Sequence, residues 1–426
     1  MQRNTVSFSV TNTEIFKQQM LGWANQFSIC CFLDNNHYTS THHSCEWLLA
    51  AGAVNIFSPE KDILFQLQNF QALHHDWLFG HFSYDLKNEA EQLASSHPDK
   101  IKFPDVFLFQ PETVLRLMDD KIIISSLNTG PFQILEAIQA TKIQAQQPLE
   151  NINIQPRISK ETYLQTIEKL RQHILRGDCY EINYCMEFFA EAAIIDPLSI
   201  YRQLIKISPN PFSSFYKLND KYLLCASPER YLKKTGSKII SQPIKGTITR
   251  NSTDELADEA NKKTLYQSSK DRSENVMVVD LMRNDLSKIC KENSVTVEEL
   301  FGIYTFPQLH QMISTIAGEL KDNMEFADIL KATFPVGSMT GAPKKRVMEL
   351  IEKYEYTKRG IFSGAVGYIT PEKDFDFNVV IRSIMYNQTN KYLSYQVGSG
   401  ITFYSNAAEE YDECLLKAKA IEEVLQ

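Results

Sequence analysis

The stretch KYLLCASPERYLKKTGSKIISQPIKGTITR, residues 221–250, alternates apolar and polar side chains on both sides of a turn that contains glycine. This alternation predicts two β-strands joined at Gly236. Lys245 would lie where the second strand ends, and Gly246 after it permits a turn or a close approach to a ligand. Lys245 is therefore either a solvated strand end or an amine directed into a cavity.

Further strands are predicted towards the C-terminus, in IFSGAVGYIT (361–370), DFNVVIRSIM (376–385) and KYLSYQVGSGITFY (391–404). Helices are predicted over about 160–176, 255–286, 342–354 and 408–425. The first is capped by Ser159 and closed by Gly177. Since strands and helices do not alternate strictly, the pattern favours α+β layering over a Rossmann domain.

The N-terminal part of the chain carries weaker signals. Residues 1–130 mix short strand-like runs with loops, and a helix is predicted over 131–140. The polar tract TKIQAQQPLENINIQPR (141–157) is a candidate linker. We therefore expect an N-terminal region over 1–150 and a catalytic region over 155–426.

Composition limits the classes of function. The 426 residues are 43% hydrophobic, and 44 Lys+Arg against 52 Asp+Glu give a net charge of −8, which argues against a nucleic-acid partner. The N-terminal residues lack the apolar core expected of a signal peptide, and no apolar run approaches the length needed to span a bilayer. The cysteines are scattered without a C-x-x-C pair, as in reduced proteins. We expect a cytoplasmic protein without membrane contact.

Acidic pairs on two predicted helices could hold a divalent cation. Glu410, Glu413 and Lys417 share one stripe of the last helix, and Asp271 and Glu274 share a face of an earlier one. Carboxylates one turn apart can bind Mg²⁺, although a solvated acidic face would show the same spacing. From the residues alone, both interpretations stay open.

Three stretches could bind an anion. FPVGSMTGAPKKRVMELI (334–351) places backbone amides at a helix N-terminus, where the helix dipole favours negative charge. Arg382 interrupts an apolar strand and requires a carboxylate partner, from the protein or from a ligand. QVGSGIT (396–402) places two glycines at a strand end, which permits close approach of a ligand to the backbone.

Eight motifs, in this order, resemble those of the chorismate-utilising enzymes: SPER, PIKGT, ENVMVVDLMRND, FPVGSMTGAPK, GAVGYI, VVIRSI, GSGI and EEYDECLLKA. This family includes the large subunits of anthranilate synthase and aminodeoxychorismate synthase, and the isochorismate and salicylate synthases. The resemblance is dense over about 160–424. It implies an α+β fold in which two antiparallel β-sheets pack as a sandwich surrounded by helices, with the N-terminal region interleaved.

Lys245 separates the branches of this family. Anthranilate synthases typically have alanine in this motif, whereas lysine marks component I of the aminodeoxychorismate synthases. The resemblance then implies conversion of chorismate and ammonia to 4-amino-4-deoxychorismate, for p-aminobenzoate and folate synthesis, through a covalent lysine intermediate. A lysine nucleophile must be uncharged, so we expect burial or nearby cations to lower its pKa.

The resemblance also implies roles for individual residues. Catalytic roles fall to Lys245, Glu229 as the acid for the leaving hydroxyl, and His310 near the reacting ring. Mg²⁺ would be held by Glu274, Glu410 and Glu413. The carboxylates of the substrate would be held by Thr340, Tyr368, Arg382, Gly398, Gly400 and Lys417.

Two departures and two alternatives accompany this interpretation. Glu181 stands where glutamine is usual in the amino-transferring branches, and its role stays open. The Leu-Leu-Glu-Ser signature of tryptophan-inhibited enzymes is lacking, so no tryptophan feedback is expected. No G-x-C-x-G nucleophile elbow occurs, so ammonia is expected from a separate glutamine amidotransferase subunit. The alternatives are anthranilate synthase component I and a catalytically silent scaffold or sensor of the same fold.

Overall fold

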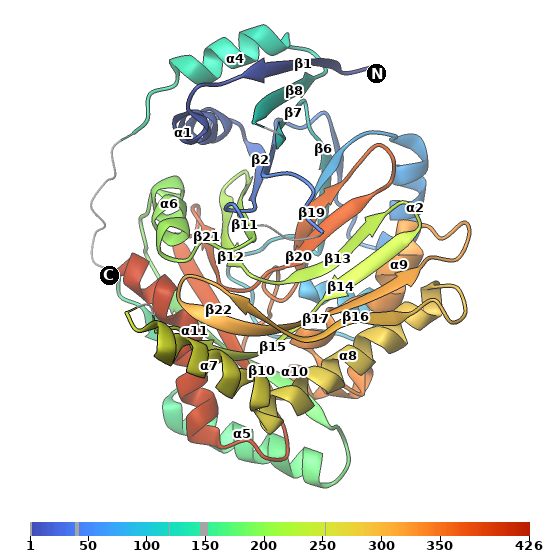
Figure 1. Ribbon diagram of the computed structural model, residues 1–426, viewed down its shortest axis with the longest axis vertical. Helices are drawn as coiled ribbons and strands as arrows, with labels where there is room; N and C mark the ends of the chain where they lie inside the picture. Colours follow the sequence, from blue (N-terminus) through green and yellow to red (C-terminus); the bar gives the residue numbers. More distant parts are fainter. Residues whose placement is uncertain (1, 39–41, 119, 145–151, 252) are drawn as a thin grey trace.

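Two antiparallel β-sheets form the centre of the molecule, and helices cover them in the computed structural model (Figure 1). The structure describes the whole chain except residues 1, 39–41, 119, 145–151 and 252. The architecture confirms the predicted α+β sandwich.

The first sheet has twelve strands. In spatial order they are β1 (Asn4–Ser9), β8 (Lys121–Ser126), β7 (Thr113–Met118), β3 (Trp47–Ala51), β2 (Ile29–Asp34), β11 (Phe212–Leu218), β12 (Lys221–Ser227), β21 (Ser383–Asn387), β22 (Tyr392–Ile401), β10 (Glu181–Ala190) and β18 (Gly341–Ala342), with β9 (Gln155–Pro156) pairing with β10.

The second sheet has ten strands. In spatial order they are β15 (Ile244–Thr249), β17 (Leu309–Glu319), β14 (Lys238–Gln242), β13 (Arg230–Thr235), β20 (Phe375–Val379), β19 (Ala365–Ile369), β5 (Leu78–Phe82), β6 (Val106–Gln110) and β4 (Asn55–Phe57), with β16 (Thr296–Thr305) pairing with β17.

The α-helices are α1 (Thr13–Ala24), α2 (Ile63–Leu73), α3 (Lys87–Glu91), α4 (Pro131–Ala140), α5 (Lys160–Leu175), α6 (Pro197–Ile207), α7 (Glu255–Gln267), α8 (Ser269–Ile289), α9 (Phe326–Thr333), α10 (Lys344–Tyr354) and α11 (Ala407–Leu425). None of the helices that the structure describes is long and apolar enough to cross a membrane.

Strand alternation divides the core into two layers. The run ICCFLD of β2 sends Cys30 and Phe32 to one face and Ile29 and Cys31 to the other, because successive side chains of a strand point in opposite directions. The first face packs against α1, α4, α5, α6, α10 and α11. The second packs against the other sheet and against α2, α8 and α9. Both faces of the first sheet are therefore buried at β2.

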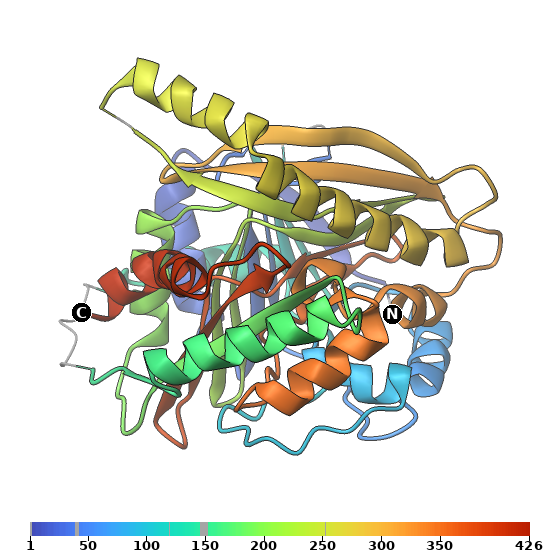
Figure 2. The ribbon, with the colours of Figure 1, turned by 90° about the horizontal axis from the view of Figure 1, so that it is seen from below.

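Local signals set most helix boundaries. Ser159 caps α5 by accepting a hydrogen bond from the Thr162 amide, as predicted. The single helix predicted over 255–286 is wrong, because Ser268 is extended and begins a new helix, α8, after α7. The helix predicted over 342–354 begins at Lys344, and Pro343 is its N-cap residue. In Figure 2, α8 crosses the strands β15 and β17 against which it packs.

Strands from both ends of the sequence share each sheet. In the first sheet β2 pairs with β11, and in the second β5 pairs with β19. The boundary expected near residue 155 stays a prediction about the sequence, and part of the predicted linker lies outside the described residues.

Candidate active site

A cavity of about 150 Å³ lies between the two sheets, beside α8 and α11. Figure 1 shows β15, β17 and β22 passing these helices in the lower half of the molecule. Eight of the predicted site residues line the cavity: Glu229, Lys245, Glu274, Arg382, Gly398, Gly400, Glu413 and Lys417.

A bulge in β15 places Lys245 at the cavity. Ile244 and Thr247 of β15 pair with Ile313 and Gln311 of β17, so β15 has one extra residue between these pairs. Gly246 in the bulge has φ +94°, and a Cβ there would lie 2.9 Å from the Cβ of Asp271. The predicted second strand corresponds to β14, which ends at Gln242 just before Lys245, and the bulge that carries Lys245 belongs to a further strand, β15.

The Lys245 amine donates a hydrogen bond to the buried carboxylate of Glu181. Burial alone would lower the pKa of Lys245, but the carboxylates of Glu181, Glu274 and Glu413 outweigh burial and raise it. The prediction of a lowered pKa is thus wrong for this structure, because the carboxylates of three residues act on the amine and together outweigh burial. In this state Lys245 is an ammonium ion.

Glu229 lies just before β13 and is almost fully buried. The Ser338 hydroxyl donates a hydrogen bond of 2.5 Å to its carboxylate. Burial raises the pKa of Glu229 to about 7, although this hydrogen bond and Lys245 oppose the rise. At neutral pH a large fraction of Glu229 therefore carries the proton that a general acid needs.

The three carboxylates predicted to bind Mg²⁺ lie in different surroundings. Glu274 on α8 lines the cavity, its Oε1 atom has no hydrogen-bond partner among the described residues, and burial raises its pKa to about 7. Glu413 also lines the cavity, and Lys417 at 2.7 Å lowers its pKa to about 2. Glu410 is turned towards Lys270, at 3.2 Å.

Within the described residues, no three His, Cys, Asp or Glu side chains are arranged to hold a metal ion. Two of the three predicted ligands pair with lysines instead, Glu410 with Lys270 and Glu413 with Lys417. The unpaired, buried oxygen of Glu274 nevertheless fits a cation, because a buried carboxylate oxygen without a donor is costly.

Cationic groups face the carboxylates across the cavity. Arg382 lies between β20 and β21, outside the strand predicted for it, and has a left-handed φ of +53°. Burial lowers its pKa to about 10, with Glu413 opposing this effect. Among the described residues, the Arg382 side chain donates one hydrogen bond, to the Lys417 carbonyl at 3.4 Å, and forms no ion pair. Arg382 can therefore receive the carboxylate of a ligand.

The two glycines of β22 allow this packing. A Cβ at position 400 would lie 2.5 Å from the Lys245 amine and 2.8 Å from the Glu181 carboxylate. At position 398 it would lie 2.7 Å from the Tyr184 carbonyl, and the Gly398 carbonyl accepts a hydrogen bond of 2.8 Å from Lys417. Only glycine therefore fits at positions 398 and 400, because any side chain would collide with these groups.

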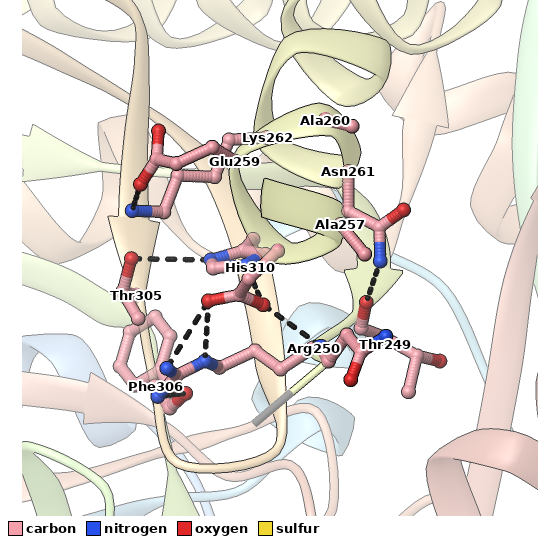
Figure 3. Close-up of polar contacts among 12 residues, drawn as sticks. Thr249, Arg250, Ala257, Glu259, Ala260, Asn261, Lys262, Thr305, Phe306 and His310 are labelled. Carbon is pink, nitrogen blue, oxygen red and sulfur yellow. Dashed lines mark hydrogen bonds and ion pairs between the residues drawn. The ribbon is translucent and has the colours of Figure 1, made fainter. Parts of the chain in front are cut away.

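His310 is not among the residues that line the cavity, and Figure 3 shows the polar contacts that surround it instead. Its side chain is fully buried on the opposite face of β17, hydrogen-bonded to Asp258 of α7 at 2.9 Å and to Thr305 at 3.1 Å. Burial would raise the pKa of Asp258, but hydrogen bonds from Asn251, His310 and Arg250 lower it to about 2. His310 therefore joins α7 to the β16–β17 hairpin.

Two other predicted residues also lie elsewhere. Thr340 is buried, and its hydroxyl donates to the Gly337 carbonyl at 3.1 Å, so it holds the loop that carries Ser338. Tyr368 lines a separate cavity of about 60 Å³ with Arg230 and Asp376. None of His310, Thr340 and Tyr368 is among the residues that line the active-site cavity.

Replacing His310 by leucine tests this structural role. Asp258 and Thr305 would each lose a hydrogen-bond partner, so we expect a loss of about 1–3 kcal/mol in stability. The melting temperature should fall, while the turnover number at low temperature changes little. A large loss of turnover in folded protein would return His310 to the catalytic site.

Other residues of the cavity were not predicted, among them Asn183, Lys270, Gln311 and Ser338. Glu181, whose role was left open, is not one of the lining residues but accepts a hydrogen bond from Lys245. Glu181 carried one signal, since a carboxylate at the start of the apolar run EINYCMEFFA requires a partner. For Gln311 no signal exists, because both faces of β17 are buried and its sequence does not alternate.

The family model of the chorismate binding enzymes matches residues 31–423. Over 362 residues the chain is 31% identical to aminodeoxychorismate synthase component 1 of Bacillus subtilis, covering 82% of this chain and 76% of that protein. It is 36% identical over 305 residues to the probable chloroplastic aminodeoxychorismate synthase of rice, covering 71% of this chain but only 32% of that protein's length.

Solved structures show the same fold. Anthranilate synthase component I from Streptococcus pneumoniae matches with a TM-score of 0.78 at 24% identity, over 92% of this chain and 96% of that one. The menaquinone-specific isochorismate synthase of Escherichia coli matches with a TM-score of 0.79 at 17% identity, over 100% and 95%. The chain belongs to the chorismate binding enzymes, which confirms the resemblance inferred from its motifs.

Proposed function

We propose that this protein catalyses the reaction of aminodeoxychorismate synthase component 1, which converts chorismate and ammonia to 4-amino-4-deoxychorismate for p-aminobenzoate and folate synthesis. The observation that carries the proposal is the amine of Lys245 in the same cavity as the protonatable carboxyl of Glu229. The printed names of curated relatives from Bacillus subtilis, Klebsiella aerogenes and Escherichia coli support it.

In the first step the Lys245 nitrogen bonds to ring carbon 2 of chorismate while the hydroxyl at carbon 4 leaves. Glu229 gives its proton to this hydroxyl, which departs as water. In the second step ammonia bonds to carbon 4 and the bond from carbon 2 to lysine breaks. Each step is easier than a direct displacement at carbon 4, which is the benefit of covalent catalysis.

Glu181 accounts for how a charged lysine can react. It is the carboxylate that accepts a hydrogen bond from the Lys245 amine, so it is positioned to take the proton from that amine. The proton would pass to Glu181 and leave a neutral amine.

The remaining residues would bind the substrate. Arg382 and Lys417 supply positive charge for its two carboxylates, and the glycines of β22 let it approach the backbone. Glu274 and Glu413, with Glu410 behind them, would hold Mg²⁺, whose charge would offset that of the ring carboxylate. Ammonia would be supplied by a separate glutamine amidotransferase subunit, in line with the name component 1 of the relatives.

Incubation with chorismate, Mg²⁺ and an ammonium salt tests the proposal. We expect 4-amino-4-deoxychorismate, identified by chromatography and mass spectrometry, and no fluorescent anthranilate. Anthranilate formed without any other enzyme would identify the alternative, anthranilate synthase component I. Failure to bind or convert chorismate would instead favour a catalytically silent protein of this fold.

A further inference from the structure

Gln311 has a buried acceptor that no described residue satisfies. It lies on β17 opposite Thr247, next to the bulge that carries Lys245. Its side chain is 3% exposed, and its Oε1 atom has no hydrogen-bond partner among the described residues. A buried amide oxygen without a donor reduces stability, so its presence at a cavity wall points to a ligand that supplies the donor.

Gln311 stands in a wall between two cavities. With Pro228, Leu309 and Arg382 it lines both the active-site cavity and a second cavity of about 20 Å³. The second cavity is otherwise bounded by the α6–β11 connection, residues 208–210, and the β16–β17 turn, residues 306–308. Its volume is enough for one water-sized molecule, and ammonia has nearly the size of water.

The small cavity lies towards the outside of the molecule. Pro209, which lines it, also lines a larger depression of about 630 Å³ between α1 and α6. On the inner side, Pro228 directly precedes the general acid Glu229. A small molecule that crosses this wall would therefore arrive beside the carboxyl group where the hydroxyl of the substrate leaves.

The groups that form the wall favour neutral ammonia over the ammonium ion. The guanidinium of Arg382 repels ammonium, and the side chains of Pro228 and Leu309 offer no hydrogen bond, so Gln311 supplies the neutral acceptor of this wall. Ammonia has N–H donors and one lone pair. Donating an N–H to Oε1 would hold it while its lone pair stays free to attack.

We propose that Gln311 binds ammonia at this wall and presents it to the substrate, a role that rests on the proposed function. The lone pair of ammonia forms the bond to ring carbon 4, and the bond from carbon 2 to the Lys245 nitrogen breaks. That nitrogen, a secondary ammonium in the adduct, leaves as a neutral amine with the bonding pair. The new ammonium group then returns a proton to the Glu229 carboxylate.

The variant Gln311→Met tests this role, since methionine keeps the length of the side chain and removes the acceptor. We expect the KM for ammonium to rise about tenfold, the loss of roughly one hydrogen bond. The KM for chorismate and the rate of Lys245 adduct formation without ammonia should not change. Because the variant removes an unsatisfied buried oxygen, its melting temperature should stay equal or rise.

Gln71→Met is the matched control, because Gln71 on α2 is a buried amide that lines neither of these cavities. It should leave the KM for ammonium unchanged. The assignment would be overturned if Gln311→Met left the KM for ammonium unchanged. It would also be overturned if the variant slowed adduct formation as much as it weakened ammonium binding, or if its melting temperature fell strongly. A parent protein that forms neither adduct nor product would overturn the proposed function instead.

Discussion

Replacing Lys245 by alanine is expected to lower the formation of 4-amino-4-deoxychorismate by roughly a thousandfold or more, as removal of a catalytic nucleophile does. The physical reason is that ammonia would then have to displace the hydroxyl at carbon 4 directly. The adduct should vanish with the activity. Protein quenched with chorismate in the absence of ammonia should carry a ring adduct on Lys245 in the parent and none in the variant, as measured by mass spectrometry.

Alanine at this position also removes the cation beside Glu181 and leaves a buried carboxylate unpaired, which is destabilising. The variant Lys245→Gln separates the two effects, because it keeps a hydrogen-bond donor towards Glu181 but has no nucleophilic amine. It should be as inactive as Lys245→Ala and more stable.

Lys238→Ala is the control for lysine loss in general, since Lys238 lies on the neighbouring β14, partly exposed and paired with Glu298. Activity and adduct should both persist in this variant. An adduct that survives in Lys245→Ala, or normal turnover without any adduct in the parent, would refute covalent catalysis. If Lys245→Ala formed anthranilate, Lys245 would be the residue that decides between the aminodeoxychorismate synthase and anthranilate synthase reactions.

The sequence motifs predicted which residues belong to the site better than they predicted which way each side chain points. Glu274 and Glu413 reach one cavity from α8 and α11, as the resemblance implied, because a helix face fixes where its residues point. His310 and Gln311 are adjacent on a strand, so one of them must face away from the cavity. The sequence of β17 cannot decide which, because both of its faces are packed.

The charge state of Lys245 shows a second limit of sequence reasoning. The chemistry requires a neutral amine, which led to the expectation of a lowered pKa. The direction depends on which charged groups surround the amine, and these come from β10, α8 and α11, far apart in the sequence. The carboxylates prevail over burial and raise the pKa, so the proposed mechanism requires the amine to lose its proton before it attacks.

Replacing Glu229 by glutamine is expected to have the second largest effect. The amide retains the shape of the side chain and a hydrogen bond with Ser338, but it cannot protonate the leaving hydroxyl. Turnover should fall by about 10²- to 10⁴-fold, the usual contribution of a general acid. Since the hydroxyl leaves as the lysine adduct forms, adduct formation without ammonia should slow by the same factor.

The pH dependence of adduct formation identifies the acid. The pKa of Glu229 is raised to about 7, so its proton is present below this value and is lost as the pH rises through it. Adduct formation in the parent should therefore slow as the pH rises above about 7, and Glu229→Gln should be slow at every pH without this decline.

Glu187→Gln is the matched control, because Glu187 is equally buried but pairs with Arg157 at 2.9 Å, outside the cavity. Its loss should reduce stability and leave the pH profile of adduct formation unchanged. A decline above pH 7 that persists in Glu229→Gln would assign the proton to another group. Glu274, whose pKa burial also raises to about 7, would then be the acid.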